Sequence, residues 1–210
     1  MSAALLIAAL LMAGPSAALD VFTAAGDSHT VAALDPAGGW TVHLGGLDVR
    51  NVALAGTRAD QWADALYPRV TREQPFVYVS HLLGTNDVLS GVTADEYAAR
   101  MLDLATREPT GVLLLTPSLL GGALGVTHNA TLAAYRERLT WICAAQPEVM
   151  CIDVQALLDP ATDLLADDVH WTPEAHQAVG ALVQSVLSVP EPRGGMLAGV
   201  LLLAYWSRRR

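Results

Sequence analysis

Val21-Phe22-Thr23-Ala24-Ala25-Gly26-Asp27-Ser28-His29-Thr30 is a short apolar run that breaks into Gly-Asp-Ser. Its first five residues predict a strand, and Gly26 can end that strand because glycine takes backbone angles that other residues avoid. Ser28 follows two positions later, at the predicted start of a helix. Open α/β sheets bind ligands beside the carboxyl ends of their strands. The stretch therefore puts a serine hydroxyl where such a sheet binds its ligand.

Strand-length apolar runs and helical patterns alternate along the rest of the chain. Further strands are predicted within residues 40–54, 75–83, 111–116 and 149–154, and helices over 59–67, from Thr93, over 130–145 and from Pro173 to about Leu187. Thr93 and Glu96 have the spacing of a capping box, and Pro173 stands at the favoured first position of a helix. Residues 119–129 are expected to form a glycine-bearing loop. The alternation predicts an α/β fold whose five-stranded parallel sheet is covered on both faces.

The composition excludes several classes of protein. A chain of 210 residues fits one domain with short appendages, and its 52% hydrophobic and 16% charged residues exclude a disordered chain. All 12 basic residues are arginine, so neither a P-loop lysine nor a Schiff-base lysine is present. The net charge of −9 leaves no basic excess for neutralising phosphates. We therefore expect no nucleic-acid partner.

Residues 1–18 have the layout of a secretory signal peptide. An apolar run over 3–13 is followed by a Gly14-Pro15 break and by the small residues Ser16-Ala17-Ala18, although no basic residue precedes the run. The run is shorter than the ~20 residues that a membrane-spanning helix needs. Export is therefore favoured over an N-terminal membrane anchor, and the folded domain is expected over residues 19–188.

The two cysteines, Cys143 and Cys151, lie eight positions apart, one near the end of a predicted helix and the other in a predicted strand. In an oxidising compartment they can form a local disulfide. Two buried thiols fit the sequence equally well. A metal site is disfavoured because no further ligands cluster around the pair.

Polar groups suited to nucleophilic catalysis follow several predicted strands. A serine nucleophile needs a base for its proton, an acid that orients the base, and donors where oxyanion charge develops. Ser28 is the candidate nucleophile, His170 the candidate base, and Asp167 the candidate acid three positions before it. The backbone N–H groups of Ser28 and Gly56 and the side-chain amide of Asn86 are the candidate oxyanion donors.

Gly26-Asp27-Ser28, Gly56, Gly84-Thr85-Asn86-Asp87 and Asp167-Asp168-Val169-His170 resemble, in chain order, the four sequence blocks of the SGNH hydrolases, also called GDSL-type esterases and lipases. The resemblance extends from Val21 to about Leu187. It implies a three-layer α/β/α, flavodoxin-like fold and attack of Ser28 on an ester carbonyl. It further implies that Ser28, Gly56 and Asn86 form the oxyanion hole and that Asp167 and His170 complete the triad. The chemistry then needs no metal ion or other cofactor.

Several residues near these blocks have competing interpretations. His29 stands where the family usually has leucine, and a water-exposed histidine at the rim is favoured over one that contacts the leaving group. Asp168 is a rival for the triad acid, but the Asp-x-x-His spacing favours Asp167. His81 is expected to pack inside the sheet, and His176 is expected on a helix surface rather than in a metal site.

Residues 189–210 form a separate tail. Val189-Pro190-Glu191-Pro192 precedes an apolar stretch over 194–206 and three closing arginines. As a helix the stretch rises only about 20 Å, short of the ~30 Å hydrocarbon core. This order resembles the PEP-CTERM sorting signal of Gram-negative bacteria, which implies transient membrane association through 194–206 and processing by an exosortase. An ordinary tail anchor is the alternative.

Together these patterns predict an exported serine esterase that cleaves an O-acyl ester of a small molecule, lipid or polysaccharide through an acyl-enzyme. The protein is then expected in the periplasm, at the cell surface or secreted. Two alternatives stay open at this point: an O-acyltransferase on the same triad, and a non-catalytic surface or glycan-binding domain.

Overall fold

A computed structural model describes residues 20–31, 38–73, 75–108, 111–158 and 164–188. At its centre is a sheet of five parallel strands: β1 (Asp20–Gly26), β2 (Leu47–Asn51), β3 (Tyr78–Leu82), β4 (Val112–Leu115) and β5 (Val149–Ile152). The strand order is β2-β1-β3-β4-β5, as in flavodoxin-like folds. This confirms the predicted α/β class. The predicted signal peptide and sorting tail lie outside the described residues.

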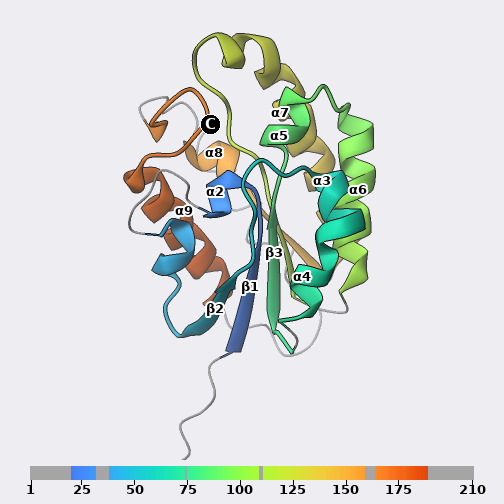
Figure 1. Cartoon of the computed structure of the whole chain (residues 1–210), viewed down its shortest axis with the longest axis vertical. Helices are drawn as coiled ribbons and strands as arrows, with labels where there is room; N and C mark the ends of the chain where they lie inside the picture. Colours follow the sequence, from blue (N-terminus) through green and yellow to red (C-terminus); the bar gives the residue numbers. More distant parts are fainter. Residues whose placement is uncertain (1–19, 32–37, 74, 109–110, 159–163, 189–210) are drawn as a thin grey trace, which may run out of the picture.

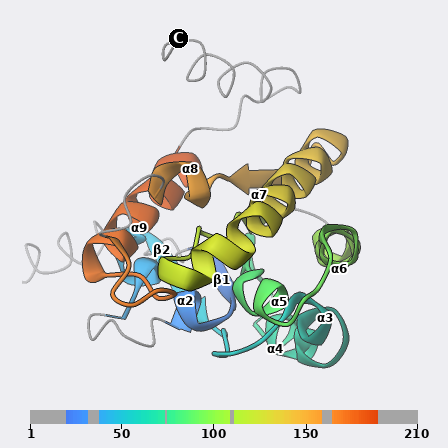
Figure 2. The same ribbon diagram turned by 90° about the horizontal axis from the view of Figure 1, so that it is seen from above.

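Helices cover both faces of the sheet (Figures 1 and 2). They are α2 (Ser28–Val31), α3 (Ala59–Gln61), α4 (Tyr67–Thr71), α5 (Thr85–Leu89), α6 (Ala94–Arg107), α7 (Gly122–Ala145), α8 (Val154–Leu158) and α9 (Pro173–Leu187), with a 3-10 helix η1 (Trp40–His43) and a π-helical segment η2 (Trp62–Leu66). Seen from above, α3, α4 and α6 lie on one side of the sheet, and α8 and α9 lie on the other (Figure 2). In the described part of the chain, no helix is both long and apolar enough to cross a bilayer.

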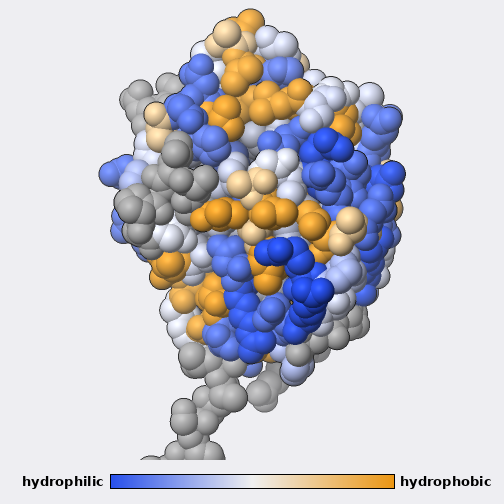
Figure 3. All heavy atoms as spheres, viewed as in Figure 1, coloured by the Kyte–Doolittle hydropathy of each residue, from blue (hydrophilic) through white to orange (hydrophobic). Residues whose placement is uncertain are grey.

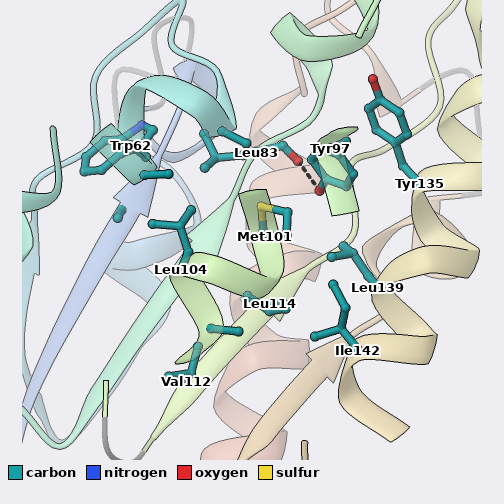
Figure 4. Packing of buried hydrophobic residues seen from close by; sticks show 14 of the residues in the cluster. Trp62, Leu83, Tyr97, Met101, Leu104, Val112, Leu114, Tyr135, Leu139 and Ile142 are labelled. Atoms are coloured by element: carbon teal, nitrogen blue, oxygen red, sulfur yellow. Dashed lines mark hydrogen bonds between the residues drawn. The ribbon is translucent and has the colours of Figure 1, made fainter. Parts of the chain in front are cut away.

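The larger core lies between the sheet and the layer of η2, α6 and α7 (Figure 4). Tyr97 of α6 stacks on Tyr135 of α7, with ring centroids 4.0 Å apart, and donates a hydrogen bond to the Leu83 carbonyl at 3.0 Å. The predicted capping box starts α6: Glu96 accepts from the Thr93 N–H at 3.0 Å, and Thr93 Oγ1 accepts from the Glu96 N–H at 3.3 Å. The outer side of α6 is hydrophilic (Figure 3), so the helix is amphipathic as its spacing predicts.

The second core lies between the opposite face of the sheet and η1, α8 and α9. Phe22 and Ala24 of β1 point into it while Ala25 points into the first, because successive strand residues face opposite sides. His176 of α9 also lies here, 2% exposed and with its ring 5.2 Å from that of Trp171. The expectation that His176 lies on a helix surface is therefore wrong, since it shares the buried stripe of α9 with Val179.

The strand predicted within residues 40–54 is β2, and η1 precedes it. One further expectation differs from the structure. The loop expected over 119–129 is wrong, because α7 already begins at Gly122. Its glycines serve close packing here: a Cβ on Gly125 would clash with the carbonyl oxygen of Leu120, and the Asn129 amide bonds both backbone groups of Leu120.

Candidate active site

Ser28 is the first residue of α2, at the carboxyl end of β1 (Figure 1). The chain turns from strand to helix at Gly26, where a Cβ would lie 2.7 Å from the carbonyl oxygen of Leu82 in the neighbouring strand. That approach excludes any side chain and leaves glycine as the residue that fits. Ser28 is 8% exposed, so most of the residue is shielded from solvent at the strand end.

A chain of hydrogen bonds runs from Ser28 to the segment before α9. His170 Nε2 lies 3.1 Å from Ser28 Oγ, and His170 Nδ1 lies 2.9 Å from Asp167 Oδ2. These are the contacts that a base needs to accept the serine proton and that an acid needs to orient the base. The structure thus brings together Ser28, His170 and Asp167, the three residues that the sequence predicts as nucleophile, base and acid.

Asp167 is fixed by its own loop. Its Oδ1 accepts the backbone N–H groups of Val169 at 2.7 Å and His170 at 2.6 Å. Partial burial opposes its ionisation, but the hydrogen bonds from the His170 ring and from these two N–H groups outweigh that effect and lower the pKa of Asp167 to about 2. The carboxylate is therefore ionised at neutral pH and holds a proton on His170 Nδ1, which leaves Nε2 to accept.

Asp168 occupies a different place. Its backbone carbonyl accepts the Gly121 N–H at 2.8 Å, and its carboxylate lies against Gly122 at the start of α7, where a Cβ would come within 2.8 Å of Cγ. Among the described residues, no hydrogen bond joins this carboxylate to His170. The geometry thus separates the two neighbouring acids as the Asp-x-x-His spacing suggested.

The three candidate oxyanion donors come from three strand ends. Asn86 Nδ2 donates to Thr57 O at 3.1 Å and, more weakly, to Asp27 Oδ2 at 3.3 Å, so it bridges the neighbours of Gly56 and Ser28. Within the described residues, no hydrogen bond involves the N–H of Ser28 or of Gly56. Gly56 has φ +76°, a conformation that favours glycine. A developing oxyanion can therefore accept hydrogen bonds from these two free N–H groups. It can also accept one from the Asn86 amide, if it replaces Asp27 as the acceptor of that amide.

Asp87 holds the loop next to these donors in place. It is buried, and both carboxylate oxygens accept the Ala59 N–H at 3.1 and 3.2 Å, which anchors the loop that carries Gly56. Burial, together with the nearby charges of Asp27 and Asp60, raises the pKa of Asp87 to about 6. The sequence offered the Gly-Thr-Asn-Asp block but no separate role for this carboxylate.

The expectation that His29 is a water-exposed rim residue is wrong. Its side chain is 2% exposed, with Nδ1 3.1 Å from Asp27 Oδ1 and Nε2 2.9 Å from the carbonyl oxygen of Val169. Its ring lies 4.7 Å from the Trp171 ring and 5.8 Å from the His170 ring. The first turn of α2 directs this side chain inward onto the segment that carries His170. No local sequence pattern signals that contact, because the two partners are 140 positions apart.

Cys143 and Cys151 are joined by a disulfide. It ties the last turn of α7 to β5, and Cys151 Sγ lies 3.1 Å from the carbonyl oxygen of Leu139. Among the described residues, no three His, Cys, Asp or Glu side chains gather as a metal site would require.

The fold has solved counterparts. Axe2, an acetylxylan esterase from Geobacillus stearothermophilus, superposes with a TM-score of 0.69 at 20% identity, over 81% of this chain and 95% of that one. LAE5, an alpha/beta hydrolase enzyme from the metagenome of Lake Arreo, Spain, superposes with a TM-score of 0.65 at 20% identity, over 80% and 94% of the two chains. At this identity the likeness establishes the fold alone.

Sequence comparison identifies the family. No curated protein sequence matches the chain significantly. The model of the GDSL-like Lipase/Acylhydrolase family matches residues 24–178, which include every candidate residue of the site. The chain therefore belongs to the GDSL-like lipase/acylhydrolase family, and it is a carboxylic ester hydrolase.

Proposed function

We propose that this protein is an exported serine esterase that hydrolyses O-acyl esters through an acyl-enzyme on Ser28, with His170 as base and Asp167 as orienting acid. The observation that carries the proposal is the hydrogen-bonded chain from Ser28 Oγ through the His170 ring to Asp167. Membership of an acylhydrolase family supplies the reaction class.

In the first half of the proposed reaction, Ser28 Oγ attacks the ester carbonyl carbon while its proton passes to His170 Nε2. The negative charge moves to the carbonyl oxygen, where the N–H groups of Ser28 and Gly56 and the Asn86 amide donate to it. Ionised Asp167 stabilises the doubly protonated His170 ring. The intermediate then expels the alcohol, which takes the proton from Nε2, and the acyl group stays on Ser28.

In the second half, water replaces the alcohol. His170 Nε2 removes a proton from the water as its oxygen attacks the acyl carbon, and the same donors stabilise the second oxyanion. Collapse returns the proton to Ser28 Oγ and releases the carboxylic acid. Every proton step uses the same nitrogen, which explains why one base suffices for both halves.

The proposed location and substrate follow from features outside the site. Export agrees with the signal-like layout of residues 1–18 and with the Cys143–Cys151 disulfide, a bond typical of oxidising compartments. The tail over 189–210 favours sorting to the surface by an exosortase-type enzyme after transient membrane association. We propose an acetylated polysaccharide as the substrate class, which agrees with the acetylxylan esterase activity in the name of Axe2.

The test compares wild type with Ser28→Ala on a p-nitrophenyl acetate substrate and on acetylated xylan. We expect hydrolysis to fall by about 10³-fold or more in the variant, with the residual rate due to the oxyanion donors. An unchanged rate in folded Ser28→Ala protein would overturn the mechanism. Wild-type activity on the small ester without release of acetate from xylan would overturn only the polysaccharide assignment.

A further inference from the structure

Both ring nitrogens of His29 face oxygen atoms. Nε2 lies 2.9 Å from the carbonyl oxygen of Val169, which can only accept, so this nitrogen must carry a proton. Nδ1 lies 3.1 Å from Asp27 Oδ1, an oxygen that also accepts the backbone N–H of His29 at 3.0 Å. An ionised carboxylate has no proton to donate, so Nδ1 is the donor in this contact. Both nitrogens therefore donate, and the ring carries a positive charge.

The electrostatics agree with this protonation state. Burial opposes a charged imidazole, but the charge of Asp27, the hydrogen bonds to Asp27 and Val169 and the charge of Asp167 outweigh it, so the pKa of His29 is raised. The titratable groups near the ring are Asp27 beside it in sequence and Asp167 and His170 on the facing segment. His176 of α9 lies beyond the Trp171 ring.

The partners of His29 belong to the other parts of the site. Val169 precedes His170 directly, and its N–H is one of the two that fix Asp167. Asp27 precedes Ser28, and its second oxygen accepts from the Asn86 amide at 3.3 Å. One side chain thus links the nucleophile's turn and an oxyanion donor to the segment that carries the base.

We infer that His29 is a positioning residue of the hydrolysis: as an imidazolium it clamps the Val169 carbonyl to Asp27 and so sets the approach of His170 to Ser28. This inference rests on the proposed function of Ser28 and His170. His29 touches neither reacting atom, so its effect is on geometry and on the field around the base. A misplacement of about 1 Å between reacting groups can cost about 100-fold in rate.

Two variants distinguish the hydrogen-bond donor of His29 from its positive charge. His29→Leu removes the donor and the charge, whereas His29→Gln removes the charge but keeps an amide donor near the position of Nε2. We expect kcat to fall about 10- to 100-fold in His29→Leu, with KM changed less than threefold, and to fall clearly less in His29→Gln. His43→Leu, at an exposed histidine of η1, is the matched control and should retain the wild-type kcat.

The inference is overturned if folded His29→Leu keeps kcat within twofold of wild type, or if His29→Gln is no more active than His29→Leu. Loss of activity in Ser28→Ala tests the nucleophile independently of His29. If Ser28→Ala is inactive and His29→Leu is fully active, the role of His29 is wrong and the proposed mechanism still holds.

Discussion

His170 Nε2 lies 3.1 Å from Ser28 Oγ, although 142 positions separate the two residues in the chain. The contact exists because β1, which lies between β2 and β3, places Ser28 at the carboxyl ends of the strands, and the segment before α9 returns to those ends. Parallel strands gather their ends on one side, so residues from four distant blocks meet there.

Replacing Asp167 should lower kcat much more than replacing its neighbour Asp168. Asp167→Asn removes the charge that holds the His170 ring and stabilises its protonated form, and we expect kcat to fall by about 10² to 10⁴-fold. Asp168→Asn is the matched control, because this carboxylate lies against Gly122 instead, and it should cost less than about tenfold. Steady-state measurement of kcat on one ester compares the two variants. Equal losses of kcat in both would contradict the assignment of Asp167 as the orienting acid.

Gly56 should matter for its backbone conformation. A Cβ at this position meets nothing within 4 Å, yet φ is +76°, so Gly56→Ala adds backbone strain of about 1 kcal/mol and displaces a proposed oxyanion N–H. Gly46 has φ +75° and equally open surroundings, but it lies before the amino end of β2, away from the carboxyl ends where the candidate site lies.

Gly46→Ala is therefore the matched control for Gly56→Ala. Urea unfolding should show similar losses of stability in the two variants, while kcat should fall about 10² to 10³-fold only in Gly56→Ala. A wild-type kcat in Gly56→Ala would remove this N–H from the mechanism.

The disulfide should contribute to stability without affecting chemistry. Cys143 and Cys151 close a loop with a sequence separation of 8, for which chain entropy predicts a contribution of about 2–3 kcal/mol to the free energy of unfolding. The double variant Cys143→Ser/Cys151→Ser should have a lower Tm and a wild-type kcat at 25 °C. Calorimetry with and without reductant checks this, since reductant should lower the Tm of wild type and leave the variant unchanged.

His81 should make the protein sensitive to acid. It is buried in β3, as expected from the sequence, and neither ring nitrogen has a hydrogen-bond partner in the described part of the chain. Burial, with a smaller effect from the charge of Arg107, lowers the pKa of His81 to about 4. The unfolded chain therefore binds a proton that the folded protein does not, and stability falls as pH drops from about 6.5 towards 4.

His81→Leu should remove that loss. Between pH 7 and pH 5 the free energy of unfolding should fall by about 2 kcal/mol less in His81→Leu than in wild type, as measured by urea unfolding at both pH values. His43→Leu, which replaces an exposed histidine, should behave as wild type. An identical pH dependence in His81→Leu and wild type would show that this ring is not the source.

The sheet was predictable because its signals are local, and the candidate site residues that the structure brings together were predicted from short motifs at the predicted strand ends and before the last helix. An apolar run that ends in Gly-Asp-Ser predicts β1 and places Ser28 at its end. The Asp-x-x-His spacing is a weak signal by itself, and it selects Asp167 and His170 as candidates because the other three blocks occur with it in chain order. Helix boundaries at Thr93 and Pro173 follow from capping chemistry within four residues.

The features that the sequence missed depend on distant neighbours. His29 looks like a rim residue until Val169 and Trp171 are packed against it, and His176 looks exposed until Trp171 covers it. Residues 119–129 suggest a loop because glycines weaken a helix, yet Gly125 lets the start of α7 pack against Leu120. In each case tertiary packing decides what local propensity leaves open.

Mass-spectrometric mapping of a fluorophosphonate adduct tests the central claim most directly, because this reagent phosphonylates the serine that a neighbouring base activates. The proposed mechanism predicts a single adduct on Ser28 in wild type, formed together with loss of esterase activity, and at least about 100-fold slower labelling in His170→Ala. An active wild-type esterase that is labelled on another serine, or that stays unlabelled at Ser28 while the reagent abolishes activity, would contradict it.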